Sequence, residues 1–347
     1  MEFLTPLADA RDFPSPTVRV NPQVLNAGNF ERSLPEAVTF CGLVDKGRTA
    51  LVVIAKSLPS HTVWLPSYHC PALVEPFLYA QKDIKFYPVT KELLPDFDWL
   101  ALHVCPGDAF MSVRFFGFDC GVQQSAEFCD HHQLTHIEDL AHAAFVKQFV
   151  GDVAATSLTK FYPHLEAGEV WSKGAFSELP ALKKHYEMLP MPWLTKCKIF
   201  WTKIKRKFVT QPSYFRYIVP GFMSKKSKAE TLKAISGRSQ QEIIDKRREN
   251  YAEITQYLAT CTWAKPLFAL KEGVAPYVIP VVITSERYFS HLRKLGIQVF
   301  RWEELSKEIQ CDVSIQYRGL LIQLPCHQDL TDKDLLCIKQ ALQKRER

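Results

Sequence analysis

Two residues near the middle of the chain have the types and the order that one kind of amine chemistry requires. Lys160 lies among small and apolar residues in the run Ala155–Pro163, at the end of a predicted strand. Burial there would lower the pKa of its ammonium and leave a free amine able to form a Schiff base. Asp139 precedes it at the end of another predicted strand. An acid followed by such a lysine is what bound pyridoxal 5′-phosphate (PLP) requires, so the sequence predicts this cofactor.

A phosphate-binding turn is expected at Gly47 and Arg48, which open a predicted helix over 48–56. The free N–H groups at a helix N-terminus bind anions, Gly47 permits close approach, and Arg48 adds charge. Ser157, three residues before Lys160, is suited to donate its hydroxyl to the same phosphate. The structural alternatives are a turn that caps a core helix and a plain serine at a strand end.

Asp139 and His142 are the candidates for polar contacts to the cofactor ring. Two unit charges about 4 Å apart attract by about 4 kcal/mol at an effective dielectric constant of about 20, enough for Asp139 to keep a pyridine nitrogen protonated. An Asp at a strand end also serves as a helix cap or turn residue. His142 could bond the phenolic oxygen of the ring, and it also fits a histidine satisfied by local hydrogen bonds.

A flat side chain against the ring is expected from Tyr68 or His69, which follow a predicted strand in the run Pro66–Pro71. Either residue could equally be ordinary packing. Phosphate turn, stacking candidate, acid and lysine follow one another along the chain as a PLP site needs.

The elements around these residues alternate as in an α/β fold. Strands are predicted at 62–65, 84–89, 109–116, 135–138 and 153–157, with helices at 71–81 and 123–133 between them. This alternation predicts a mostly parallel sheet with helices on its faces. In such sheets ligands bind at the carboxyl ends of strands, where Asp139 and Lys160 both fall.

A smaller unit is expected after residue 228. It begins with a polar helix over 239–260, and strands at 277–283, 297–302 and 320–324 and helices at 286–295 and 332–343 follow. Together these elements predict a C-terminal α+β domain. We place the boundary near residue 236, with a large PLP-binding domain over 1–235 and a small domain over 236–347.

The composition is that of an ordinary globular enzyme. With 347 residues, 47% hydrophobic and 23% charged, the chain can form two domains with cores of their own. We expect a cytoplasmic protein, because its start lacks the basic and apolar regions of a signal peptide and its apolar runs are only strand-sized. The ten cysteines form no CxxC pair and fit reduced thiols. No metal site is expected, since Cys129-Asp130-His131-His132 fits a polar helix end.

The basic residues concentrate in one segment, about 183–228, an insertion in the large domain. It holds twelve Lys or Arg and a single acid, Glu187. Apolar residues between Trp193 and Phe208 recur at helical spacing among the lysines, which predicts an amphipathic basic helix. Such a helix could contact an anionic membrane surface, close over the diphosphate of a nucleotide-linked substrate, or pack on the core with a solvated cationic face. No nucleic-acid recognition motif accompanies it, so no nucleic-acid partner is expected.

Eight short motifs are spread along almost the whole chain, from about residue 42 to 343. They are GRTAL (47–51), LPSYHCP (65–71), FFG (115–117), IEDLAHA (137–143), SLTK (157–160), RRENY (247–251), HLRKLGI (291–297) and LPCH (324–327). In this order they resemble the DegT/DnrJ/StrS family of sugar aminotransferases, which are fold-type I PLP enzymes of the aspartate aminotransferase superfamily. The resemblance implies a three-layer PLP-transferase-like large domain.

The same resemblance implies roles for individual residues. Lys160 would form the Schiff base, Asp139 would pair with the pyridinium, and Ser157 and the Gly47-Arg48 turn would contact the phosphate. His142 would contact the ring oxygen directly or through a neighbour. It also implies a homodimer with active sites at the subunit interface.

Three functions remain open at this stage. The first is an aminotransferase that takes an amino group from an amino-acid donor, with glutamate as the candidate, and gives it to a keto acceptor such as a nucleotide-linked keto sugar. The second is a PLP-dependent lyase or dehydratase. Related dehydratases carry histidine in place of the lysine, so Lys160 favours transamination. The third is a non-catalytic relative that uses the fold for binding or assembly.

Overall fold

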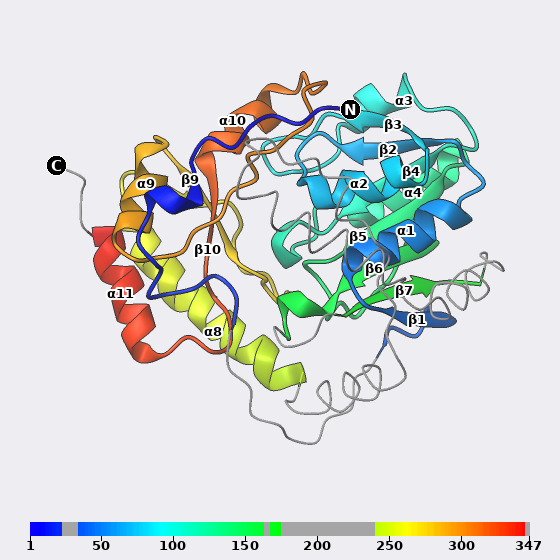
Figure 1. Ribbon diagram of the computed structural model, residues 1–347. Helices are drawn as coiled ribbons and strands as arrows, with labels where there is room; N and C mark the ends of the chain where they lie inside the picture. The colour runs from blue at the N-terminus through cyan, green and yellow to red at the C-terminus, as the bar shows by residue number, and fades with distance from the viewer. Residues whose placement is uncertain (23–33, 163–166, 175–239, 344–347) are drawn as a thin grey trace, which may run out of the picture.

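The computed structural model describes residues 1–22, 34–162, 167–174 and 240–343, which form a larger and a smaller unit side by side (Figure 1). The larger unit contains the strands β1 (Phe40–Val44), β2 (Thr62–Pro66), β3 (Asp83–Tyr87), β4 (Ala109–Val113), β5 (Thr135–Leu140), β6 (Val153–Ser157) and β7 (Gly168–Ser172). Its helices are α1 (Gly47–Ser57), α2 (Pro71–Tyr79), α3 (Phe97–Ala101) and α4 (Val122–His132). Short 3₁₀ turns cover Phe115–Gly117 and Leu158–Lys160.

The larger unit is built on one sheet with the strand order β1-β7-β6-β5-β4-β2-β3. Strand β7 runs antiparallel to both of its neighbours, β1 and β6, and the other pairs of the described sheet are parallel, so the predicted mostly parallel sheet is confirmed. The connections from β2 to β3 and from β4 to β5 run in opposite directions across the sheet. Because parallel crossovers are right-handed, α2 and α4 lie on opposite faces, and α1 packs beside α2. The result is the predicted three-layer α/β arrangement.

One predicted strand, 109–116, ends earlier than expected, at Val113. The next residues turn sharply, and Phe116 takes a left-handed backbone conformation with φ of 61°. Such a conformation is costly for a bulky residue and persists only where surrounding contacts require it. The turn therefore marks a place where the fold gives up regular structure for a specific contact, described below.

The smaller unit contains a three-stranded antiparallel sheet of order β10-β9-β8 with helices around it. Its elements are α8 (Gln240–Leu258), β8 (Ala264–Pro266), β9 (Ile279–Ile283), α9 (Arg287–Lys294), α10 (Asp312–Leu320), β10 (Leu321–Leu324) and α11 (Asp332–Gln343). The strand predicted at 297–302 is wrong, because this segment pairs only through single bridges at Ile297 and Phe300. It leaves the sheet to carry Trp302 towards the larger unit.

Residues 1–22 run along the smaller unit. The N–H of Leu4 donates to the carbonyl of Leu305 at 2.8 Å, and the N–H of Gln298 donates to the carbonyl of Val18 at 2.8 Å. Both ends of the chain thus contribute to the smaller unit (Figure 1). The boundary predicted near residue 236 and the basic segment 183–228 lie outside the described residues.

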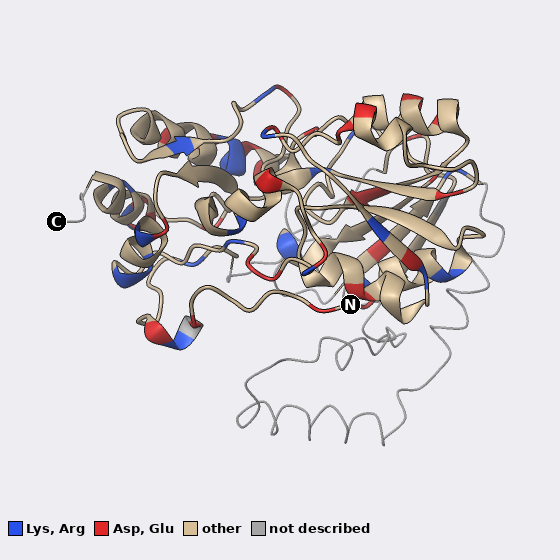
Figure 2. Cartoon of the chain, turned by 90° about the horizontal axis from the view of Figure 1, so that it is seen from above, with Lys and Arg blue, Asp and Glu red and all other residues tan. Residues whose placement is uncertain are grey.

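Four further properties bear on the function classes. Within the described ranges no helix is long and apolar enough to cross a membrane, and no group of three or more His, Cys, Asp or Glu is arranged to hold a metal ion. The run Cys129–His132 ends α4 as expected. Basic and acidic residues are interspersed over both units in the view from above (Figure 2).

Candidate active site

Asp139 and Lys160 lie at the same edge of the sheet. Asp139 is on β5, paired with Val113 of β4 and Ala155 of β6. Lys160 lies in the turn that follows Ser157, the last residue of β6. Because neighbouring parallel strands end at one edge, the fold brings the acid and the lysine together.

Lys160 contacts His142 directly, with 2.6 Å between Nζ and Nε2. The other ring nitrogen, Nδ1, accepts a hydrogen bond from the backbone N–H of Phe116 at 3.1 Å. A neutral imidazole whose Nδ1 accepts carries its proton on Nε2, so His142 donates to Lys160. An ammonium has no lone pair to accept that bond. This geometry favours a free amine at Lys160, and the backbone N–H of Phe116 holds His142 in the matching orientation.

The pKa shifts agree with this geometry. Burial lowers the pKa of the Lys160 amine, against the smaller effects of Cys70 and Asp139, which favour the ammonium. Burial likewise lowers the pKa of His142 well below its ordinary value, and the nearby Lys160 lowers it further. Burial raises the pKa of Asp139, while the N–H of Ala141, which bonds its Oδ1 at 2.8 Å, and Lys160 act in the opposite direction. The half-buried Lys160 amine and the buried Asp139 carboxyl thus lie close enough for each to influence the pKa of the other.

Aromatic rings from both units enclose the amine. Lys160 Nζ lies 4.9 Å from the ring centroid of Tyr277, and the ring of His142 is stacked between Tyr277 and Phe116. Trp302 lies over the same cluster, 5.6 Å from His142 between ring centroids. The sequence analysis missed Tyr277 and Trp302 as site residues, because both come from the smaller unit.

The predicted phosphate turn is next to Ser157. A Cβ added to Gly47 would lie 3.0 Å from the Cβ of Ser157, so no side chain fits between them. Helix α1 begins at Gly47, and no side chain caps it through the residue before, Lys46. A Cβ on Gly168 of β7 would lie 2.6 Å from the nitrogen of Gly47, which keeps this corner free of side chains. Free N–H groups and a hydroxyl therefore meet at one point, as an anion site requires.

Arg48 is directed less towards the predicted phosphate turn than the sequence suggested, because it also pairs with a carboxylate. Its Nη1 lies 3.7 Å from Oε2 of Glu75, a buried carboxylate on α2. Burial raises the pKa of Glu75 to about 7, and Arg48 acts to lower it. The Arg48 side chain is close to half exposed. It pairs with Glu75 and remains near the turn.

The two stacking candidates have different surroundings. Tyr68 is fully buried, and its ring stacks on Trp302 with 5.1 Å between centroids, which joins it to the cluster around His142. His69 stacks on Phe86, and its Nε2 accepts the N–H of Ser306. Tyr68 is therefore connected to the candidate site, whereas the contacts of His69 are those of a packing residue.

Arg247, in the middle of α8, fixes the backbone of the site. Its Nη1 donates to the carbonyl of Tyr277 at 2.8 Å, and its Nη2 donates to the carbonyl of Lys160 at 3.2 Å. Its Nε donates to Gln328, whose amide in turn donates to the carbonyl of Phe161. One fully buried guanidinium thus holds the lysine and the ring beneath it in register. The sequence offered a signal for this residue only as part of the motif at 247–251.

Comparison with known proteins gives a consistent result at the level of the fold. No family model and no curated protein sequence matches the chain. Solved structures do: PseC of Helicobacter pylori, an aminotransferase involved in the biosynthesis of pseudoaminic acid, is 14% identical, with 88% of this chain and 86% of that one covered and a TM-score of 0.66. 3-Amino-5-hydroxybenzoic acid synthase is 16% identical over 88% and 86%, with a TM-score of 0.66. NtdA of Bacillus subtilis, solved with bound cofactor PMP, is 15% identical over 88% and 73%, with a TM-score of 0.67.

The chain has the fold of these aminotransferases. The PLP-transferase-like fold expected from the motifs is thereby confirmed. The residues at the sheet edge also fit the cofactor of this aminotransferase fold. Gly47 and Ser157 leave a corner that a Cβ would fill, Asp139 offers a buried carboxyl, and Lys160 offers a free amine.

Four buried histidines make the stability of this aminotransferase fold sensitive to acid. Burial lowers the pKa of His69 to about 3, of His136 and His327 to about 4, and of His142 well below its usual range. In the unfolded chain each takes up a proton near pH 6.5, so between about pH 6.5 and 4 the unfolded state binds more protons. Stability should fall as pH falls, by up to about 5 kcal/mol per pH unit when all four contribute.

Urea unfolding midpoints at pH 7.5, 6 and 5 would measure this dependence. His136→Asn should reduce the slope by about a quarter, because one of the four protons is then absent. A free energy of unfolding that stays constant from pH 7.5 to 5 would contradict the assignment of neutral buried rings.

Proposed function

We propose that the chain is a PLP-dependent aminotransferase of the sugar-aminotransferase type. It transfers an amino group from an amino-acid donor, with glutamate as the candidate, to a keto acceptor. The observation that carries the proposal is the contact between Lys160 and His142, whose Nδ1 is held by the Phe116 N–H, because this arrangement favours a free amine. The fold, common to several aminotransferases, supports the same reaction class.

When bound, PLP supplies an aldehyde that reacts with amines and a ring that accepts electrons from the carbon next to nitrogen. The protein residues provide binding and proton transfer. The first turn of α1 and Ser157 would hold the phosphate, and Asp139 would hold the ring nitrogen. Lys160 Nζ holds the cofactor and then moves the proton at the amino-bearing carbon of the donor, since its lowered pKa leaves it able to accept one. His142 orients the lone pair of Nζ through Nε2–H.

The aromatic cluster has a role in excluding water. Tyr277, Phe116 and Trp302 surround His142, and Arg247 fixes the backbone of Tyr277 from the smaller unit. Removal of water keeps Lys160 uncharged and strengthens the interaction of Asp139 with a cation. The site therefore depends on how the two units are joined.

The nature of the acceptor is the finer part of the proposal. PseC is described by its part in pseudoaminic acid biosynthesis, and the synthase of 3-amino-5-hydroxybenzoic acid is named for a product that is not a sugar. Both a nucleotide-linked keto sugar and a non-sugar ketone therefore stay within the proposal. The homodimer and a membrane contact through 183–228 also stay predictions.

A two-step screen tests the proposed function. The purified protein, loaded with PLP, is mixed with single amino acids, glutamate first, and formation of pyridoxamine phosphate is followed by absorbance. Donors that react are then paired with nucleotide-linked keto sugars and with simple 2-oxo acids. Protein that binds no PLP would support a non-catalytic relative. Protein that binds PLP but converts it with no donor would support the lyase or dehydratase alternative.

Asp139→Asn should preserve PLP binding and slow the donor half-reaction by about 10³-fold, because about 4 kcal/mol of charge interaction is lost. Stopped-flow absorbance at saturating donor would measure the rate. Glu138→Gln is the matched control, since Glu138 is on the same strand but bonds Arg114 on the other face of the sheet. Equal losses in both variants would mean that Asp139 acts through the fold and has no direct part in the reaction.

A further inference from the structure

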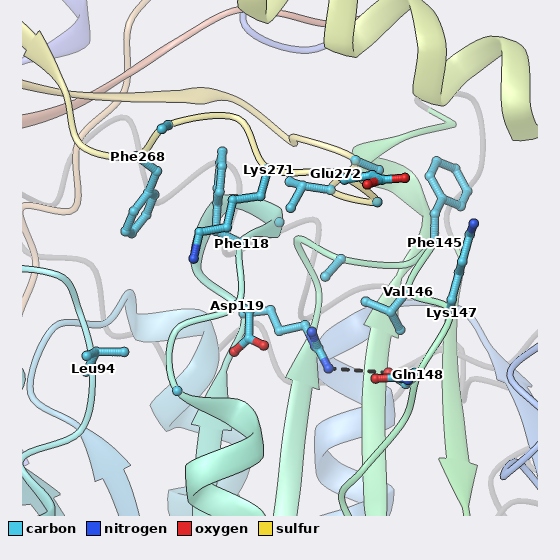
Figure 3. Close-up of a pocket in the computed structure, with 18 of the residues that line it drawn as sticks. Leu94, Phe118, Asp119, Phe145, Val146, Lys147, Gln148, Phe268, Lys271 and Glu272 are labelled. Carbon is cyan, nitrogen blue, oxygen red and sulfur yellow. Dashed lines mark hydrogen bonds between the residues drawn. The ribbon is translucent and has the colours of Figure 1, made fainter.

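A cavity lies on the side of the sheet opposite to the face that carries Asp139. It has a volume of 750 Å³, and residues that follow β4 and β5 line it together with the segment 267–275 of the smaller unit (Figure 3). Small-molecule sites favour such places, where two units meet at the carboxyl ends of parallel strands. The cavity therefore has the position of a ligand-binding site.

This cavity is distinct from the site around Lys160. Side chains alternate between the two faces of a strand, so Glu138 and Asp139 of β5 point to opposite faces. Arg114, which lines the cavity, bonds Glu138 with 2.6 Å between Nε and Oε1. Neither Lys160 nor Asp139 lines the cavity.

Arg114 lies at the inner end of the cavity, and neighbouring groups hold its guanidinium in place. The side chain of Arg114 is only 12% exposed, and Glu138 fixes it from behind while the backbone N–H groups of Val150 and Gly151 fix Glu138. Nη2 bonds the carbonyl of Gln148 at 3.3 Å, and no described residue bonds Nη1. Because Arg114 lines the cavity, its remaining N–H donors are available to a ligand there. A planar fork held in this way matches a carboxylate.

Aromatic rings form part of the walls, beside the charged side chains of Asp119, Lys147 and Glu272. Phe118 and Phe268 lie 4.8 Å apart between ring centroids on one side, and Phe145 lies across from them (Figure 3). Lys271 extends over the opening from the smaller unit. A cation at the inner end and aromatic side chains along the walls fit a ligand with an anionic group and an apolar body.

We propose that this cavity binds a small carboxylic acid with a ring-sized apolar body, its carboxylate on Arg114 and its body among Phe118, Phe145 and Phe268. Binding in this cavity takes no part in the proposed transamination, but the cavity and the candidate active site share one wall. A Cβ on Gly117 would lie 2.5 Å from the carbonyl of Ala275 and 3.1 Å from that of His142. The wall is thus the tightly packed turn whose N–H holds His142.

Binding of 4-fluorophenylacetate, followed by ¹⁹F NMR on the PLP-loaded protein, tests the proposal. We expect saturable binding at one site per chain. The matched ligand 2-(4-fluorophenyl)ethanol, which lacks the carboxylate, should bind at least tenfold more weakly. Arg114→Lys keeps a cation beside Glu138 but loses the fork, and it should weaken binding of the acid about tenfold while the alcohol is unaffected.

Two further variants make the result decisive. Ala269→Trp places bulk at an exposed lining position and should abolish binding even if Arg114→Lys fails to fold. Lys160→Ala should bind the acid as the unchanged protein does. Absence of saturable binding would overturn the proposal. Binding that is lost in Lys160→Ala but retained in Ala269→Trp would also overturn it, because the acid would then occupy the candidate active site.

Discussion

Replacing Lys160 by alanine is expected to abolish covalent attachment of PLP and to slow the donor half-reaction by about 10²- to 10⁴-fold, the usual contribution of a positioned general base. The reason is that Nζ is both the attachment point and the proton carrier of the proposed site. Reduction with borohydride followed by peptide mass spectrometry would measure the attachment. In the unchanged protein the label should map to the peptide that contains Lys160.

The effect should be specific to this amine. Lys265→Ala, an exposed lysine of β8, should leave both attachment and rate unchanged. Lys160 is half-buried and lies outside the packed core, so the variant should fold. A reducible adduct that persists in Lys160→Ala would show that another lysine holds the cofactor.

The pH dependence of the same reaction follows from the burial of Lys160. Burial lowers its pKa from the ordinary value of about 10.4, so the rate should fall with decreasing pH through an inflection below that value. Stability responds in the same direction. Between the lowered pKa and about pH 10.4 the unfolded chain holds the proton that the folded chain has lost, and stability rises as pH rises.

The residues that local pattern could identify were those at the ends of strands. Asp139, Ser157 and Lys160 stand out because a parallel sheet puts the ends of neighbouring strands at one edge, a rule that needs only the order of elements. Gly47 and His142 followed from the same order. The structure brings Lys160 and His142 into contact and puts Gly47 against Ser157.

The residues that pattern could not identify come from far along the chain. Tyr277 and Trp302 follow Lys160 by more than a hundred residues, and no local rule says which side of the smaller unit faces the site. Trp302 was assigned to a strand over 297–302, but its ring packs on Tyr68 and Phe116, and its segment pairs only through single bridges at Ile297 and Phe300. Strand β7 was missed because its polar Glu169 breaks the apolar pattern, although that residue is buried.

Arg247 connects these two groups of residues, and replacing it by lysine is expected to damage both stability and chemistry. The guanidinium serves the carbonyls of Lys160, Pro276 and Tyr277 together with Gln328. A lysine ammonium cannot reach all four. Each buried acceptor left unpaired costs about 1–3 kcal/mol, so Arg247→Lys should lower the free energy of unfolding by about 2–5 kcal/mol. Urea titration would measure this loss.

The same change should also alter the pH profile, which a purely structural residue would not do. If the turn at Lys160 loosens from Tyr277, water reaches Nζ and its pKa moves back towards the ordinary value. The inflection of the half-reaction rate should therefore shift to higher pH. Arg248→Lys is the matched control, because Arg248 is the next residue of α8 and, among the described residues, bonds the carbonyls of Lys271 and Val274. An unshifted inflection in Arg247→Lys would mean that Arg247 joins the two units without setting the state of the lysine.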